Sequence, residues 1–150
     1  MISGPPALIA IHHDDYHAEY IGHTGDGRQF FLTAPFIAAH EGQPGREFLA
    51  LFLFDKSGKF LEARIDDLGT RNDMDRHDAA DLLAKRLDEL EPFEYGNIEI
   101  QPFQVERFGT LFGLIVRPPD EDVGGGWWVE LHPGNYMAFH EPWDSGEYDT

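Results

Sequence analysis

Short apolar runs, several of them alternating with polar residues, recur along the chain between positions occupied by Gly, Asp, Asn and Pro. Their length and spacing are typical of antiparallel strands joined by tight turns. The pattern predicts strands at residues 8–13, 16–23, 28–33, 47–54, 59–66, 98–103, 111–117, 127–132 and 136–140. Turns at residues 25–27, 55–58 and 133–135 contain Gly and are expected to close three hairpins.

Only one segment has the period of a helix. Its apolar stripe consists of Ala79, Leu83, Leu87 and Leu90. The pattern predicts a helix over about residues 75–90, with Asp73 or Asp75 as its N-cap and Pro92 ending it.

Three acids, Asp88, Glu89 and Glu91, crowd the C-terminal end of the predicted helix. Negative charge is unfavourable there because the helix dipole already places partial negative charge at that end. Either the overall acidity is tolerated, or this end of the helix faces a cation.

The segment 47–54 is apolar on both faces, with Phe48 and Phe52 on one side and Leu49 and Leu51 on the other. Such a strand is central and covered on each side, yet one helix covers only one face of a sheet. The other face is expected to meet the end hairpins of the same chain or a second copy in a homodimer. We therefore predict one α+β domain over residues 1–150: a mainly antiparallel, strongly bent sheet of about seven or eight strands, with the helix packed on one face.

The net charge of the chain limits the kinds of partner that it can bind. The chain has 28 Asp and Glu residues against 11 Lys and Arg, which gives a net charge of −17. No Lys or Arg follows Arg117, and eight acids do: Asp120, Glu121, Asp122, Glu130, Glu141, Asp144, Glu147 and Asp149. A field of one sign repels nucleic acid and anionic membrane and attracts basic proteins. The alternative is that the acidity only keeps the protein dissolved.

Composition sets further limits. Apolar residues make up 41% of the chain, enough for a proper core, and Cys is absent, which excludes disulfides and thiol nucleophiles. The N-terminal segment lacks a basic region and its apolar stretch is too short to span a bilayer, so we expect a cytoplasmic protein. Signatures of serine hydrolases, phosphate-binding loops and calcium loops are missing. The sequence therefore gives no catalytic signature and no cofactor.

Eight histidines invite a metal hypothesis, for which His13 and His17 are the weak candidates. A turn between them could bring the two rings together, whereas neighbouring His12 and His13 point to opposite faces of a strand. The spacings of known zinc motifs are absent. Polar residues around a turn are the simpler interpretation.

The last hairpin offers the best candidate surface. Pairing across residues 133–135 sends Trp127, Val129, Leu131, Met137 and Phe139 toward the core, with Trp128 expected opposite His140 and His132 opposite Tyr136. The opposite face carries Trp128, Glu130, His132, Tyr136, Ala138 and His140. Aromatic residues with polar tips are enriched in interfaces. Burial of these aromatics as ordinary packing is the alternative.

The C-terminal tail adds Trp143, Asp144, Glu147 and Tyr148 to this candidate surface. Trp143 and Tyr148 would anchor in pockets of a basic partner while the acids steer it. In the alternative interpretation, Trp143 docks on the body of the protein and the tail frays.

Two hypotheses of function follow. The first is an acidic, non-enzymatic binding protein that engages a basic protein, as immunity proteins and inhibitors of similar composition do. It assumes that the surplus acids form a contiguous, solvent-facing zone in the C-terminal part. The second is a small-ligand or metal-binding domain, or a small enzyme, that uses the His, Glu and aromatic face of the last hairpin.

Overall fold

The computed structural model describes residues 6–14, 18–39, 41–42, 44–70, 76–119, 126–134, 137–140, 143 and 146–148. Within these residues the fold is mostly antiparallel sheet with one helix, which confirms the α+β class. The elements are β1 (Ile9–Ile11), β2 (Tyr20–Thr24), β3 (Gln29–Thr33), β4 (Phe36–Ile37), β5 (Arg46–Phe54), β6 (Phe60–Thr70), α1 (Arg76–Asp88), β7 (Phe93–Tyr95), β8 (Ile98–Ile100), β9 (Phe103–Arg107), β10 (Thr110–Arg117), β11 (Trp128–His132), β12 (Met137–His140) and β13 (Gly146–Tyr148).

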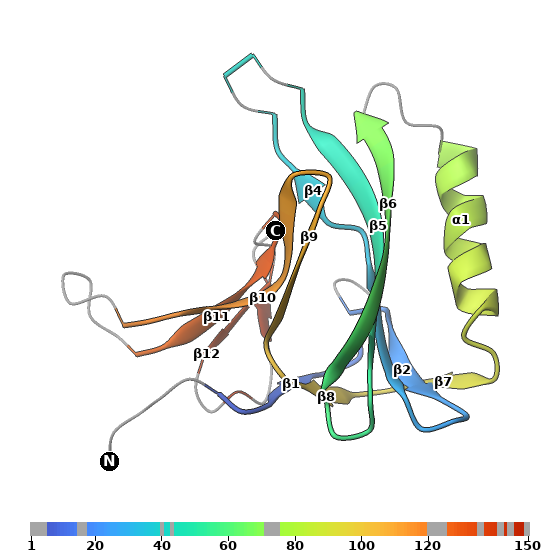
Figure 1. Cartoon of the computed structure of the whole chain (residues 1–150), viewed down its shortest axis with the longest axis vertical. Helices are drawn as coiled ribbons and strands as arrows, with labels where there is room; N and C mark the ends of the chain where they lie inside the picture. The colour runs from blue at the N-terminus through green and yellow to red at the C-terminus, as the bar shows by residue number, and fades with distance from the viewer. Residues whose placement is uncertain are drawn as a thin grey trace.

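The thirteen strands of the described residues form three sheets, so the prediction of one strongly bent sheet of about seven or eight strands is wrong. A six-stranded sheet has the order β4-β5-β3-β2-β7, with β6 on the opposite edge of β5, and a five-stranded sheet has the order β13-β12-β11-β10-β9. A short pair, β1 and β8, makes the third. Figure 1 shows the five-stranded sheet on the left, the six-stranded sheet in the middle and α1 on the right.

The separation of the sheets has a local cause at Pro102. The predicted strand 98–103 is divided into β8, which pairs with β1, and β9, which pairs with β10. Gln101 and Pro102 lie between them, outside both strands. Because proline has no backbone N–H to donate, a sheet ladder is readily interrupted at such a position. The chain changes sheets here.

β5 is the central strand that its two apolar faces predict. Phe48, Phe52 and Phe54 lie in the core between the two large sheets, together with residues such as Phe112 and Leu131. The second face of the sheet is thus covered by the C-terminal hairpins of the same chain. Many of these rings meet edge to face, which is a favourable aromatic geometry.

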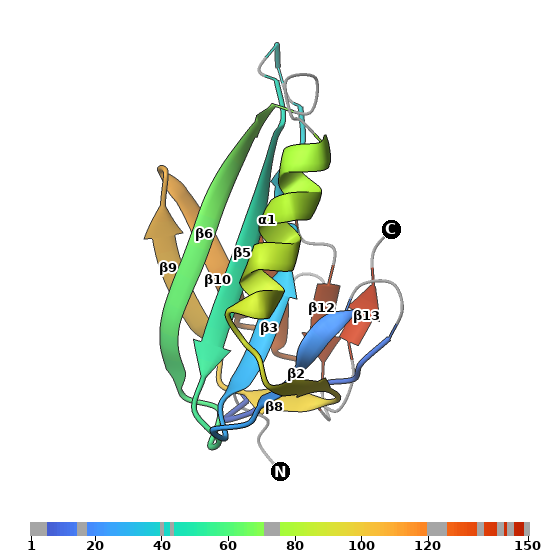
Figure 2. The same ribbon diagram turned by 90° about the vertical axis from the view of Figure 1, so that its right-hand side faces the viewer.

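The opposite face of β5 packs under the helix. Leu49, Leu51 and Leu53 form a second core with Leu90, against which Leu82, Leu83 and Leu87 of α1 are packed. Figure 2 shows α1 lying across this face of the sheet. The helix is slightly shorter than the predicted 75–90, and residues 73 and 75, the predicted caps, lie outside the described part. No helix in the described part has the length and apolar character needed to cross a membrane.

The acids at the helix end have different surroundings. Glu89 is paired with Arg64 of β6 and with Arg86, at 3.3 and 2.6 Å, and Arg86 also reaches Asp66 at 2.8 Å. These arginines offset the unfavourable position of Glu89 at the helix terminus. Glu91 has no such partner among the described residues.

Candidate functional site

The outer face of the last hairpin is built as its alternation predicts. β11 and β12 pair with Trp128 opposite His140 and Val129 opposite Phe139, which confirms the expected register. Val129 and Phe139 are fully buried in the core between the sheets. Tyr136 lies outside the described residues, so its expected pairing with His132 stays a prediction.

Glu130 is the centre of a polar network on this face. Its Oε1 accepts a hydrogen bond of 2.8 Å from Trp128 Nε1, and its Oε2 lies 3.1 Å from His132 Nε2. Arg117 on β10 adds an ion pair, with Nε 3.4 Å from Oε1 of Glu130 and Nη2 3.4 Å from His132 Nε2. The network joins two strands through four polar side chains.

Sequence reasoning missed Arg117 as a member of this site. Its register position on β10, opposite Trp128, places it on the outer face beside the hairpin. The signal was available, because the same alternation that orients 127–132 also orients 111–117.

The network keeps Glu130 ionised. Burial alone raises the pKa of this carboxyl, whose side chain is 19% exposed, but the hydrogen bonds from Trp128 and His132 and the charge of Arg117 outweigh it. The pKa of Glu130 therefore lies below its ordinary value. Its negative charge is matched locally by Arg117, which leaves little of it to steer a partner.

The residues of the predicted tail surface are placed differently from one another. The Trp143 backbone accepts a hydrogen bond from Ala10 N and donates one to His140 O, each 2.8 Å, and its side chain packs against the core between the sheets. Trp143 thus docks on the body. Glu147 and Tyr148 belong to β13, whose backbone pairs with β12, so this segment extends the sheet. Their side chains and Asp144 lie outside the described part.

The metal candidates have other contacts. His13 Nε2 lies 2.9 Å from the Glu19 carbonyl oxygen, and its ring stacks on Tyr95 with a centroid distance of 5.5 Å. His17 lies outside the described residues. Within the residues that the structure describes, no group of three or more His, Asp or Glu side chains could hold a metal ion.

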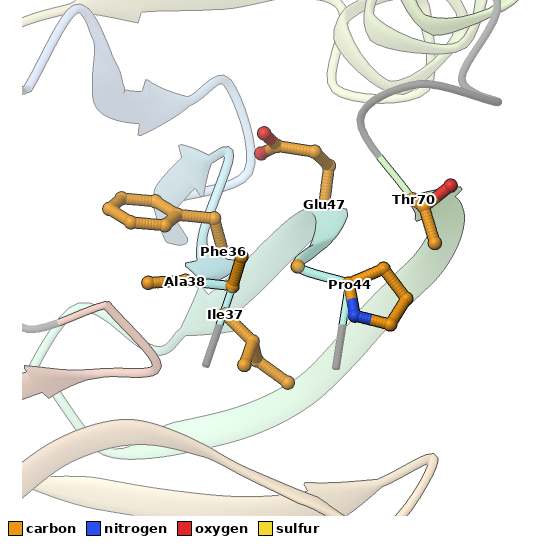
Figure 3. A pocket seen from close by; sticks show the side chains of 8 residues that line it. Phe36, Ile37, Ala38, Pro44, Glu47 and Thr70 are labelled. Atoms are coloured by element: carbon orange, nitrogen blue, oxygen red, sulfur yellow. The ribbon is translucent and has the colours of Figure 1, made fainter. Parts of the chain in front are cut away.

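A cavity of about 360 Å³ opens beside β4, which lies at the opposite end of the strand order of the six-stranded sheet from β7. Its lining comes from β4 and the two residues after it, from the start of β5 and the residues before it, and from the end of β6 (Figure 3): Phe36, Ile37, Ala38, Ala39, Pro44, Gly45, Glu47 and Thr70. The lining is mostly apolar and has one carboxylate. It brings together no set of groups for acid–base or nucleophilic chemistry.

The predicted acidic zone can be followed only in part. Asp120, Glu121, Asp122, Glu141, Asp144 and Asp149 lie outside the described residues. Elsewhere, exposed acids that form no ion pair with another described residue are Glu19, Asp81, Asp88, Glu91, Glu94, Glu99 and Glu106. The hypothesis assumes a contiguous acidic zone in the C-terminal part of the chain. In the described part, exposed acids without an ion pair also occur around α1 and the short strands β7 to β9, outside that zone.

The fold defines an α+β protein in which two antiparallel sheets pack face to face and one helix covers the outer side of the larger sheet. No protein-family model, curated protein or solved structure matches the chain. Its function is accordingly argued from its own side chains.

Proposed function

We propose that the protein is an acidic, non-enzymatic binding protein that engages a basic protein partner, in the manner of an inhibitor or immunity protein. The net charge of −17 is the starting point. A charge of this size raises the encounter rate with cationic partners and opposes association with nucleic acid and anionic membranes.

The observation that carries the proposal is the way in which the arginines are used. Each of five arginines forms an ion pair with an acid of the same chain: Arg28, Arg46, Arg64, Arg86 and Arg117. These ion pairs engage five of the 11 Lys and Arg residues, while exposed acids such as Glu94, Glu99 and Glu106 form none with another described residue. Such carboxylates lose the least by pairing with an external cation, because they give up no internal partner.

A ligand-binding or catalytic role for the outer face of the last hairpin is the second candidate. It is supported by the half-buried Glu130 and His132, whose carboxylate and imidazole lie 3.1 Å apart. The lowered pKa of Glu130 makes it a weak general base, and its oxygens already have Trp128 and Arg117 as partners. The geometry thus favours a structural role for this network over catalysis.

Affinity capture from an extract of the source cell tests the proposal. With the full chain immobilised, we expect retention of proteins of high isoelectric point at about 50 mM NaCl and their release at about 500 mM, since salt screens charge attraction. A variant with Glu94→Gln, Glu99→Gln and Glu106→Gln should retain less, and a Gln101→Ser, Gln104→Ser variant should retain as much as the native chain. Retention that is indifferent to salt, or retention of acidic proteins only, contradicts the proposal.

A further inference from the structure

We propose that an exposed aromatic surface at the edge strand β7 binds an arginine side chain of the basic partner. This surface, the Tyr95 patch, consists of His13, Glu19, Tyr20, Glu91 and Tyr95. The inference rests on the proposed function and deepens it, because it gives the partner a contact of defined chemistry. In Figure 1, β7 lies at the edge of its sheet beyond β2, below the C-terminal end of α1.

The Tyr95 ring is held firmly and yet is open to solvent. It stacks on His13 with an interplanar angle of 21°, and its centroid lies 5.2 Å from that of Phe93 and 6.2 Å from that of Tyr20. The residue is nevertheless 46% exposed. A ring fixed by its neighbours loses little entropy when a ligand covers it, which favours binding.

The backbone under the patch is fixed by Gly22. In the register of β2 and β7, Gly22 lies opposite Tyr95. A Cβ atom at residue 22 would overlap the Glu94 carbonyl oxygen, so β7 could not lie this close to β2 with any other residue there. The position of Tyr95 beside Tyr20 therefore depends on a close approach that glycine alone permits.

Two carboxylates make the electrostatic potential of the Tyr95 patch negative. Glu19 and Glu91 are exposed and form no ion pair with another described residue. Burial raises the pKa of Tyr95, and the charges of both acids raise it further; burial and Glu19 do the same to the pKa of Tyr20. Glu19 is thus close enough to act on both phenols and Glu91 to act on Tyr95, which places the two rings in negative potential.

The guanidinium of arginine fits this combination better than other ligands. It stacks on aromatic faces and donates two parallel hydrogen bonds to a carboxylate, whereas the lysine ammonium is a compact and strongly hydrated charge. An anionic ligand would be repelled by Glu19 and Glu91, and an uncharged apolar one would supply no positive charge to either carboxylate.

The test compares peptides of equal charge on the full-length protein. Tetra-arginine amide and tetra-lysine amide are titrated at physiological salt, with the dissociation constant measured by calorimetry and the Tyr95 ring signals followed by NMR. We expect tetra-arginine to bind more tightly and to shift the Tyr95 signals. Tyr95→Leu should weaken tetra-arginine binding about two- to fivefold, the effect of one exposed cation–π contact, and should change tetra-lysine binding less.

Two double variants of equal charge distinguish binding by the Tyr95 patch from attraction by the overall negative charge of the protein. Glu19→Gln with Glu91→Gln should weaken tetra-arginine binding more than Glu99→Gln with Glu106→Gln, although each pair removes the same charge. Tyr95→Phe keeps the ring and should bind normally. It gives a second measurement at this position if the Tyr95→Leu protein folds poorly. Equal losses from the two Glu pairs, with no response of the Tyr95 signals, would overturn the patch but leave the proposed function standing. Failure of both peptides and of the cell capture would overturn the proposed function as well.

Discussion

Among single residues, Arg117 and Glu130 alter the interpretation of the last hairpin as a charged binding surface. Glu130 was expected to be one of the acids that attract a partner, but it is already bound by Trp128, His132 and Arg117. The side chains that remain available are exposed carboxylates that form no ion pair with another described residue, such as Glu19 and Glu91. Whether a carboxylate already has a cationic partner, and not the number of acids in a segment, therefore decides which residues can bind a basic protein.

Replacing Glu130 by Gln tests this interpretation of the network. Because folding lowers the pKa of Glu130, its contribution to stability is complete above the unfolded-state pKa and is lost as the pH falls through the folded-state pKa. We expect Glu130→Gln to lower the free energy of unfolding by about 1–2 kcal/mol at neutral pH, since Arg117 loses its ion pair and Trp128 a charged acceptor. Urea unfolding at neutral pH and at about pH 3 measures the difference, which should shrink in acid.

The control is Glu99→Gln, which removes an equally negative but exposed carboxylate without an ion pair in the described part. Its effect on the free energy of unfolding should stay within about 0.5 kcal/mol at both pH values. If Glu130→Gln behaved like this control, the network would contribute nothing to stability and the outer face would be free for another role.

At the scale of elements, the β9–β10 hairpin shows how closely two strands are joined. Gly113 has a φ of 138° and lies opposite Gln104 of β9. A Cβ atom there would overlap the Phe103 carbonyl oxygen. Phe103 in turn stacks on Phe60 and meets Phe52 and Phe54 edge to face, so the hairpin is tied directly to the core between the sheets.

Gly113→Ala is expected to destabilise the protein by more than about 2 kcal/mol, because it combines an unfavourable φ with a steric clash against backbone. Gly109→Ala is the matched comparison. Gly109 also has a positive φ, 69°, but open space where its Cβ would lie, so its cost should be about 1 kcal/mol. Thermal unfolding of both variants measures the difference, and equal melting temperatures would show that the clash is relieved by a small shift of β9.

Many of the strands and their pairing could be predicted from the sequence, wherever the local pattern of apolar residues determines them. The two-faced strand 47–54 became the central β5, and the hairpin around residues 133–135 has the expected register. The short strands β4 and β7 were missed because each has only two or three residues, too few to show a period. Their position depends on pairing with β5 and β2, which is a property of the folded chain.

The two candidate sites also differ in whether a local sequence pattern predicts them. The outer face of the last hairpin could be predicted because it lies on one regular hairpin. The Tyr95 patch could not be predicted, since it brings together residues 13, 19–20 and 91–95, which the chain places on three separate segments. Only the close approach of β7 to β2 and of the segment after β1 makes these rings neighbours.

At the scale of the whole molecule, charge is the dominant property. Self-repulsion at −17 opposes compaction, and the ion pairs of Arg64 with Glu89 and of Arg86 with Asp66 partly relieve it. The remaining surplus favours any partner that supplies positive charge. A homodimer, the alternative that the sequence leaves open, would bring two such negative fields together. This repulsion is why we propose a basic partner and not a second copy of the chain.

The most direct test of this account is the salt dependence of binding to the basic protein recovered by capture. The logarithm of its dissociation constant should rise steeply with the logarithm of the NaCl concentration between about 50 and 300 mM, because screening weakens attraction between charged surfaces. The Glu94→Gln, Glu99→Gln, Glu106→Gln variant should give a shallower slope than the native chain. A dissociation constant that stays constant over this range, with the same value for both proteins, would contradict the claim that surplus carboxylates engage the partner.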